Sequence, residues 1–249
     1  NSYVYSLILV RILKQFEKKK IFSEKIDKYI ALSPFSRQKF VDNRFNPEEI
    51  FIKPNFIELD SGPAQMNGKY GLFIGALRDY KGIKTLLKAW KNSKIDFPLK
   101  ILGAGPLQEE LKIYVKGEKV EFLGTKPLTE TLSLIKASLF LVVPSECYET
   151  FSRVAMEAFA CGVPVIATNH GALKDLVENR RTGLFFERAD SNDLAEKIDL
   201  LVKNPSLAKE LGENARKVYQ ERYAESENYD QLIEIYSRTI EGYFQKKNK

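Results

Sequence analysis

Residues 139–168, LFLVVPSECYETFSRVAMEAFACGVPVIAT, contain the pattern strand, helix, strand. The apolar run LFLVVP ends at a proline, an Ala-rich helical segment follows, and VPVIAT is a second apolar run. Short apolar strands that alternate with helices are typical of a parallel sheet with both faces covered. This stretch therefore predicts an α/β fold.

The same alternation extends over most of the chain. Helical segments separate further strand-like runs at residues 70–76, 99–103, 120–124 and 183–186. In the helix after the first run, an apolar stripe at helical spacing is expected to face the core: Ile83, Leu86, Leu87 and Trp90. The next helix is predicted to begin at Pro106. Such a sheet binds its ligand at the carboxyl ends of its strands.

The composition excludes several classes of protein. Of the 249 residues 44% are hydrophobic and 29% charged, which is ordinary for a globular protein and excludes a disordered chain. The formal net charge of +6 leaves nucleic acid, an anionic membrane and phosphate-bearing ligands open. Two cysteines, Cys147 and Cys161, are too few for a disulfide framework, so a reducing, cytoplasmic setting is expected. No apolar run approaches the ~20 residues of a membrane span.

Two cations follow the strand that ends at Gly75. Arg78 and Lys81 stand just before the start of the next helix. Free N–H groups and the helix dipole attract anions there, and nearby cations add to that attraction. The segment therefore predicts a phosphate site, although a solvated basic turn would look the same.

Two glutamates flank the start of the helix in the opening stretch. Glu149 lies on the loop before it, and Glu157 lies about one and a half turns inside. Because long helical side chains lean toward the N-terminus, Glu157 is predicted to point back toward the ligand crevice. A ribose diol would match a carboxylate there, since two O–H donors meet two oxygens. The alternative is that both are exposed glutamates favoured by the helix dipole.

Other patterns are weak or missing. Gly103 belongs to a G-x-G turn that departs from the dinucleotide pattern, so it is interpreted as a tight turn near the crevice. Gly171 offers a backbone N–H that could approach a ligand closely. One histidine, His170, and two cysteines make a zinc site improbable. No D-x-D pair, P-loop or nucleic-acid motif occurs, and no nucleic-acid partner is expected.

Taken together, the segments resemble the group 1, family 4 glycosyltransferases. The match is the E-x7-E motif from Glu149 to Glu157, followed by AFACGVPVIAT. Its neighbours FIGALRDYKG, ILGAGP, VEFLG, VVPS, GLFFERAD and DLAEKI occur in family order. The resemblance covers roughly residues 70–205 and implies a Rossmann-like parallel sheet with helices on both faces, the C-terminal half of a GT-B fold.

The resemblance also implies roles for single residues. Arg78 and Lys81 would hold the donor diphosphate, Glu157 the ribose, and Glu149 the transferred sugar. The remaining contacts would come from two groups of residues: the first-turn Gly75 with Phe151, Ser152, Arg153 and Gly171 around the donor, and Gly103 with Phe122 near the nucleobase. Similar enzymes retain anomeric configuration and need neither a metal nor another cofactor. Three positions depart from the family pattern: Ala76 where an arginine is common, Ser152 where a glycine is common, and Ala172 where the later turn of the family has a second glycine.

The implied function is transfer of a sugar from a nucleotide sugar, such as a UDP- or GDP-sugar, to a glycan or lipid-linked acceptor. Cell-surface polysaccharide biosynthesis is the expected setting. Two alternatives stay open: a non-catalytic nucleotide-sugar-binding module, and an epimerase or phosphorylase of the same fold. The chain begins at Asn1 rather than Met, and we expect it to be a fragment.

The resemblance divides the chain into four segments. Residues 1–55 are expected to be a remnant of the acceptor domain with its hinge, and residues 56–69 a linker. Residues 70–223 would form the donor-binding domain, and residues 224–249 a helix that returns toward the N-terminal domain. A helix over residues 1–20 ends in three lysines, Lys18 to Lys20. They leave open a peripheral contact with the inner face of the membrane, or simply a solvated helix end.

Overall fold

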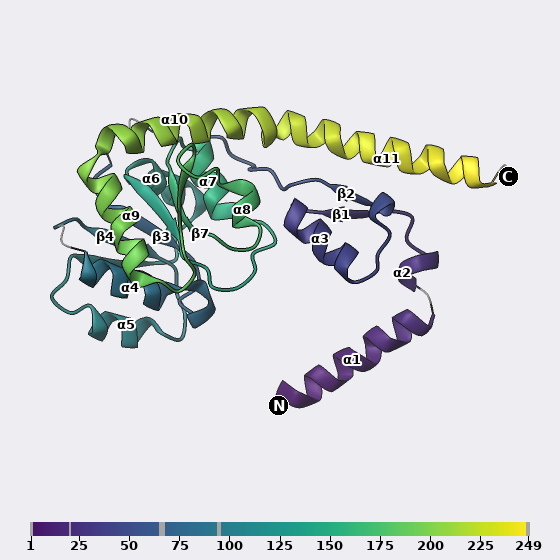
Figure 1. The fold of residues 1–249 in the computed structure, drawn as a ribbon, viewed down its shortest axis with the longest axis horizontal. Coiled ribbons are helices and arrows are strands. Elements are labelled where there is room, and N and C mark those ends of the chain that lie inside the picture. Colours follow the sequence, from purple (N-terminus) through teal and green to yellow (C-terminus); the bar gives the residue numbers. More distant parts are fainter. Residues whose placement is uncertain (1, 20, 65–67, 94–95, 248–249) are drawn as a thin grey trace.

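The computed structural model describes residues 2–19, 21–64, 68–93 and 96–247. Its main feature is a six-stranded sheet in which neighbouring strands are parallel, in the order β5-β4-β3-β6-β7-β8 (Figure 1). The strands are β3 (Gly71–Ile74), β4 (Leu99–Leu102), β5 (Val120–Gly124), β6 (Phe140–Val143), β7 (Val165–Thr168) and β8 (Gly183–Phe186). These are the apolar runs of the sequence, and the predicted parallel α/β sheet is confirmed.

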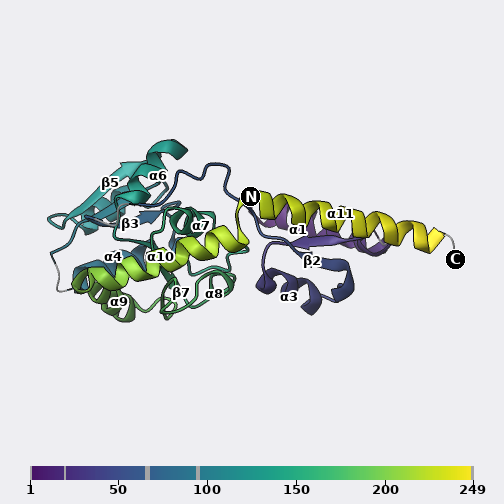
Figure 2. The same ribbon diagram turned by 90° about the horizontal axis from the view of Figure 1, so that it is seen from above.

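Helices cover both faces of the sheet, as predicted (Figure 2). One face carries α4 (Ile83–Asn92), α5 (Gln108–Tyr114) and α9 (Ser191–Lys203), and the other carries α6 (Leu128–Lys136), α7 (Arg153–Ala160) and α8 (Leu173–Leu176). The next helix, α10 (Pro205–Arg222), contributes Leu211 to the first apolar core and Ala215 to the second. It therefore joins the two layers at one edge of the sheet.

The apolar stripe predicted after β3 is buried in the first of these cores. Ile83, Leu86 and Leu87 are 0% exposed, and Trp90 is 7% exposed. The predicted start of the next helix at Pro106 is wrong, because α5 begins at Gln108. The N–H of Leu107 donates to the carbonyl of Leu77 at 3.3 Å. This contact holds the chain before α5 against the loop after β3 instead of in the helix.

The strand order reverses direction between β3 and β6. From β3 the chain continues through β4 to β5 on one side, and from β6 it continues through β7 to β8 on the other. The loops that leave β3 and β6 therefore separate at the carboxyl edge and leave a crevice between them. This switch point is where sheets of this kind bind ligands.

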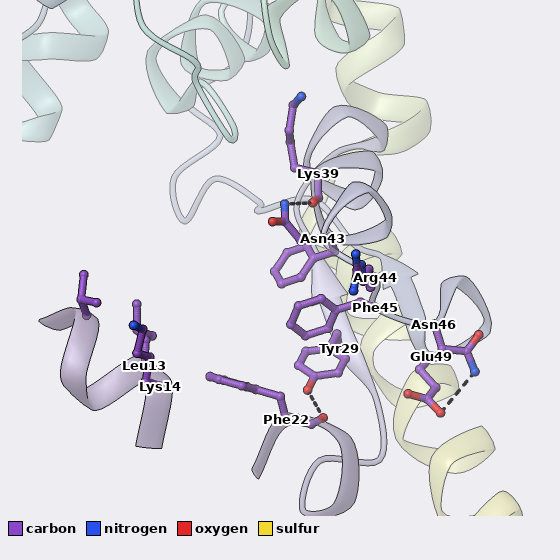
Figure 3. Close-up of a pocket in the computed structure, with 12 residues that line it drawn as sticks. Leu13, Lys14, Phe22, Tyr29, Lys39, Asn43, Arg44, Phe45, Asn46 and Glu49 are labelled. Carbon is purple, nitrogen blue, oxygen red and sulfur yellow. Dashed lines mark hydrogen bonds between the residues drawn. The ribbon is translucent and has the colours of Figure 1, made fainter. Parts of the chain in front are cut away.

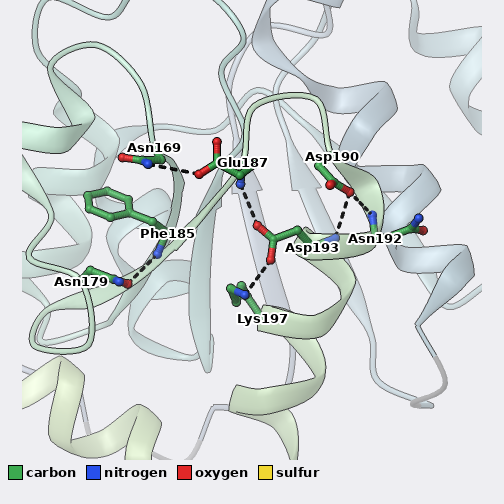
Figure 4. Close-up of polar contacts among 8 residues, drawn as sticks. All are labelled: Asn169, Asn179, Phe185, Glu187, Asp190, Asn192, Asp193 and Lys197. Carbon is green, nitrogen blue, oxygen red and sulfur yellow. Dashed lines mark hydrogen bonds and ion pairs between the residues drawn. The ribbon is translucent and has the colours of Figure 1, made fainter.

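Polar contacts tie together the loops that follow β7 and β8 (Figure 4). Asp190 caps α9 by accepting the N–H of Asp193 at 3.0 Å. The Asp193 carboxylate accepts the N–H of Glu187 at 2.8 Å and pairs with Lys197 at 2.6 Å. Asn169 donates to the Glu187 carboxylate at 3.2 Å. One end of the ligand-binding edge is thereby held rigid.

The first part of the chain forms a small separate unit. Strands β1 (Tyr29–Ala31) and β2 (Ile50–Ile52) pair in parallel, and α3 (Pro34–Asp42) and the short η1 (Pro47–Glu49) connect them. The last helix, α11 (Glu225–Lys247), extends alongside this unit (Figure 1). Asn228 at its start accepts from Lys53 Nζ at 2.7 Å and donates to the Pro54 carbonyl at 2.6 Å. The start of the last helix is thus in contact with the segment that follows β2.

A wide depression of about 970 Å³ lies between α1 (Ser2–Lys18) and the outer face of this unit. Phe22, of the short helix α2 (Ile21–Glu24), lines it together with Tyr29 and Phe45 (Figure 3). No residue of the predicted site lines it. Within the described ranges, no helix has both the length and the apolar character needed to cross a bilayer. Lys20, the last of the three lysines noted above, lies outside the described residues.

Candidate functional site

A cavity of about 290 Å³ opens at the switch point between β3 and β6. The strand ends form its floor, and the loop before α7 with the first turn of α7 forms its wall. Its lining comprises Phe73, Ile74, Gly75, Ala76, Lys81, Val143, Pro144, Ser145, Glu149, Phe151, Ser152, Arg153 and Val154. Most of the E-x7-E loop therefore meets the first strand–helix turn, as a donor site at this edge requires.

Glu149 and Lys81 form an ion pair in this cavity. Lys81 Nζ lies 2.6 Å from Glu149 Oε1, and the two side chains are 28% and 17% exposed. Ser145 Oγ donates to the same carboxylate oxygen, also at 2.6 Å. No described residue donates to Oε2. One oxygen of Glu149 is thus used by the protein, and the other is open to a ligand.

The close approach of Lys81 depends on the glycine that follows it. Gly82 has φ +69°, and a Cβ there would lie 1.8 Å from the carbonyl oxygen of Pro144. The short helix η2 (Asp79–Lys81) is also fixed to the loop after β6, because the Tyr80 carbonyl accepts the N–H of Glu146 at 2.9 Å. Only glycine allows this contact, which places Lys81 against the loop of Glu149.

The N-terminus of α7 presents positive charge to the same cavity. Ser152 caps the helix, its side chain accepting from the N–H of Ala155 at 3.4 Å. The N–H groups of Arg153 and Val154 have no acceptor among the described residues. The exposed Arg153 guanidinium likewise makes no hydrogen bond or ion pair within the described ranges. Free N–H groups, the helix dipole and this guanidinium together favour an anion.

Glu157 is the most buried acidic group near the site. It is 6% exposed, and burial raises the pKa of its carboxyl, while the positive charge of Arg153 acts in the opposite direction. Its carboxylate accepts no hydrogen bond from any described residue. Burial removes water from around the carboxylate and disfavours its charged form, which is the physical basis of the raised pKa. Hydroxyl groups of a ligand would supply the missing donors.

Not every residue of the predicted site reaches the cavity. Arg78, Gly103, Phe122, Glu157 and Gly171 are absent from its lining. Arg78 is exposed at the start of η2, and Phe122 packs against the core on β5. Gly103, with φ +140°, brings β4 close to β3, since a Cβ there would lie 1.9 Å from the Gly75 carbonyl oxygen. The roles implied for these residues stay predictions.

The loop of Glu149 also contacts the small N-terminal unit. Ser36 Oγ of α3 donates to the Thr150 carbonyl at 3.2 Å, and the Phe35 N–H donates to Asp175 at 2.7 Å. The Phe35 ring lies 4.9 Å from that of Tyr148, which stacks on His170 at 4.4 Å. His170, a lone histidine in the sequence, is therefore part of an aromatic contact between the two units. In the described ranges, no three His, Cys, Asp or Glu side chains gather as a metal site.

Sequence reasoning did not single out Ser145. It lines the cavity, is 2% exposed and contacts Glu149 directly. Its position immediately after the proline that ends β6, four residues before Glu149, is the signal that could have indicated it. Arg153 was predicted to line the pocket as part of a helix start, and the structure adds an unpaired guanidinium at that place.

The family model for group 1 glycosyl transferases matches residues 57–218, more than half of the chain. The chain belongs to the group 1 glycosyltransferases. The matched region of this glycosyltransferase includes the whole six-stranded sheet and every residue that lines the cavity.

Several relatives are similar to this glycosyltransferase in sequence. The uncharacterised glycosyltransferase MJ1178 of Methanocaldococcus jannaschii is 36% identical over 193 residues, 76% of this chain and 54% of the relative. D-rhamnosyltransferase WbpZ of Pseudomonas aeruginosa is 29% identical over 178 residues, 70% of this chain and 46% of WbpZ. The chain thus spans about half the length of these relatives.

Solved structures show the same fold. HepE of Anabaena in complex with UDP-glucose superposes with a TM-score of 0.77 at 22% identity, over 85% of this chain and 64% of HepE. A glycosyltransferase of Rickettsia africae reaches 0.79 at 22% identity, over 91% of this chain and 67% of that one. The predicted fold, a Rossmann-like parallel sheet of the kind found in GT-B glycosyltransferases, is confirmed.

Proposed function

We propose that the cavity between β3 and β6 binds a nucleotide sugar and that this chain is the donor half of a retaining glycosyltransferase. The reaction transfers a sugar from a donor such as a UDP- or GDP-sugar to a glycan or lipid-linked acceptor. The observation that carries the proposal is one cavity that combines Lys81, Arg153, a helix N-terminus and the half-free carboxylate of Glu149.

The diphosphate has a matching environment at the start of α7. The free N–H groups of Arg153 and Val154, the Arg153 guanidinium and Lys81 all belong to residues that line the cavity. Charge that grows on a departing diphosphate is stabilised by such preorganised donors. Arg78, which the family resemblance favours for this role, is the competing cation from outside the cavity lining.

The ribose and the sugar have separate carboxylates. Glu157, buried and without a donor among the described residues, would accept the two hydroxyls of a ribose. Glu149 would accept a hydroxyl of the transferred sugar through Oε2. The nucleobase would lie toward Gly103 and Phe122, at the turns after β4 and β5.

Similar proteins support this choice of ligand. HepE was solved with UDP and with UDP-glucose, and TarM of Staphylococcus aureus with UDP. Among relatives in sequence are the D-rhamnosyltransferase WbpZ and the capsular polysaccharide biosynthesis glycosyltransferase CapM. On these grounds we place the reaction in polysaccharide biosynthesis. A cytoplasmic reaction that needs no metal cofactor, as the family resemblance implies, is part of the same proposal. The division into acceptor remnant, linker, donor domain and returning helix is part of the same proposal.

Calorimetry with UDP-, GDP- and ADP-sugars tests the donor site directly on this chain. We expect one of the three to bind at or below about 1 mM, and Glu157→Ala to weaken it. Glu221→Ala, which alters an exposed glutamate of α10, serves as the control. If no nucleotide sugar bound at millimolar concentration, the proposal would be wrong. The anomeric configuration of the product, measured by NMR with the protein in its full encoded length, tests retention.

A further inference from the structure

We propose that Ser145 is a positioning residue for Glu149, which holds one carboxylate oxygen in place so that the other meets the donor sugar. The inference rests on the proposed function, because it specifies how the sugar-binding carboxylate is oriented. Ser145 would act through the Glu149 side chain.

The contact geometry shows how the carboxylate is held. Glu149 Oε1 receives Ser145 Oγ and Lys81 Nζ, each at 2.6 Å. Hydrogen bonds to an ionised oxygen at such short distances are strong and directional. Two donors on one oxygen leave the second oxygen, Oε2, without a partner among the described residues. The carboxylate is therefore divided into a protein-bound oxygen and a ligand-facing oxygen.

Ser145 is itself fixed by the core. It is 2% exposed, it follows Pro144 at the end of β6, and its carbonyl accepts Thr168 Oγ1 at 2.8 Å. Thr168 ends β7 and is 0% exposed. Ser145 thus follows the end of β6 and is tied by a hydrogen bond to the buried end of the neighbouring strand β7. A short side chain that is fixed in this way can hold the Glu149 carboxylate more precisely than the long, partly exposed side chain of Lys81 can.

The two donors differ in what a ligand does to them. Lys81 lines the same cavity as the proposed diphosphate site, so a bound diphosphate competes with Glu149 for its ammonium group. Ser145 is neutral, so a bound diphosphate attracts it less strongly than it attracts the Lys81 ammonium group. When the donor is bound, Ser145 is consequently the contact that keeps Glu149 in position. Its loss should affect turnover more than binding of the nucleotide.

A double-mutant cycle separates this role from a structural one. Ser145→Ala, Glu149→Ala and the double variant are compared with the wild type in the full encoded length, by kcat, KM for the sugar nucleotide, and calorimetry with UDP. We expect Ser145→Ala to lower kcat roughly tenfold or more, since small misplacements of a reacting group have effects of that order. UDP affinity should stay within about twofold of the wild-type value. In the Glu149→Ala background the serine change should have no further effect on kcat.

Two further variants serve as controls. Ser138 is also buried, 1% exposed, and its Oγ donates to the Ile135 carbonyl at 2.7 Å, away from the cavity. Ser138→Ala should leave kcat unchanged. Ser145→Cys keeps the shape of the side chain with a slightly larger atom and donates more weakly, so its kcat should fall between those of the wild type and Ser145→Ala. This variant also replaces Ser145→Ala if the alanine protein does not fold.

Three results would overturn the proposal. They are an unchanged kcat in Ser145→Ala, equal losses of kcat and UDP affinity, and losses that simply add in the double variant. If the wild type neither binds UDP nor transfers sugar, the proposed function fails first, and the role of Ser145 fails with it. The wild-type measurements therefore distinguish the two failures.

Discussion

Lys81 Nζ and Glu149 Oε1 lie 2.6 Å apart, although 68 residues separate them in the chain. The ammonium group expected to meet phosphate and the carboxylate expected to meet sugar are therefore paired with each other before any ligand binds. Their charges compensate, so the remaining positive character of the cavity comes from Arg153 and the N-terminus of α7. A diphosphate would enter a site in which one cation is engaged and another is unpaired.

Replacing Arg153 is expected to weaken nucleotide binding more than replacing Arg78. Arg153 lines the cavity, whereas Arg78 is exposed and does not. A hydrogen bond to a charged group contributes roughly 1.5–3 kcal/mol, so Arg153→Ala should raise the Kd for UDP about tenfold or more. Arg78→Ala is the matched control and should change it little. Calorimetry with UDP measures both Kd values. A larger rise in Kd for Arg78→Ala than for Arg153→Ala would indicate that Arg78 binds the phosphate.

Glu157→Gln is expected to stabilise the unliganded protein while weakening nucleotide binding. Burial raises the pKa of Glu157, so the folded state holds the proton more tightly than the unfolded state. The protonated form of Glu157 stabilises the folded state fully below the pKa that the group has in the unfolded chain. This stabilisation is lost as the pH rises through the pKa of the folded state. At about pH 7 the charged carboxylate therefore disfavours folding, and the neutral glutamine removes that penalty.

Thermal unfolding with and without UDP measures both effects. The Gln variant should melt higher than the wild type without UDP at about pH 7, and this gain should shrink toward about pH 4. UDP should raise its melting temperature less than that of the wild type. Glu221→Gln, on the exposed face of α10, should change neither quantity. A variant that melts lower and still binds UDP normally would make Glu157 a structural residue.

Gly82→Ala should destabilise the fold more than Gly124→Ala does. The two glycines have nearly equal φ values, +69° and +67°. A Cβ at Gly124 meets nothing within 4 Å, whereas one at Gly82 would lie 1.8 Å from the Pro144 carbonyl oxygen. Gly124→Ala therefore isolates the left-handed backbone penalty of about 1–2 kcal/mol. Denaturant unfolding should show a larger loss for Gly82→Ala, and equal losses would contradict the packing argument.

Asp60→Asn should lower the free energy of unfolding at neutral pH. This difference from the wild type should disappear at acidic pH. Two guanidinium nitrogens of Arg216 lie 2.6 and 2.8 Å from the Asp60 carboxylate, and this contact lowers the pKa of Asp60. A depressed carboxyl pKa stabilises the fold above the unfolded value, and the stabilisation disappears as the pH falls through the folded value.

Melting curves across that acidic range test the link between the segment before β3 and α10. Asp42→Asn is a suitable comparison, because hydrogen bonds from Gln38 and Lys39 also lower the pKa of Asp42, but these contacts are exposed. Exposed pairs contribute little to stability, so this change should be nearly neutral. If Asp60→Asn were equally neutral at all pH values, the contact with Arg216 would not stabilise the fold.

Part of the cavity lining followed from local pattern, and the predicted residues that lie outside it do so for physical reasons. Glu149, Lys81 and the start of α7 line one cavity, and their nearness was predictable because strand ends and helix starts are visible as periodicity. Arg78 was predicted at the site because it stands with Lys81 beside a helix start and because the family resemblance implies it. In the structure η2 turns between them, so Lys81 faces the loop of Glu149 while Arg78 is exposed. The direction of a side chain in such a turn cannot be predicted from the spacing of residues in the sequence.

By itself, the sequence determined that this chain forms a parallel sheet with helices on both faces, because apolar periodicity is a local property of each segment. It also determined that an E-x7-E segment follows one of the strands. Only the tertiary structure decided that β3 lies beside β6, and thereby which loops meet. Because these two strands are neighbours, Lys81 pairs with Glu149. Ser145 and Arg153 line the cavity between the strands, and Glu157 is buried. Contacts between distant segments depend on how whole layers pack, which no short stretch of sequence contains.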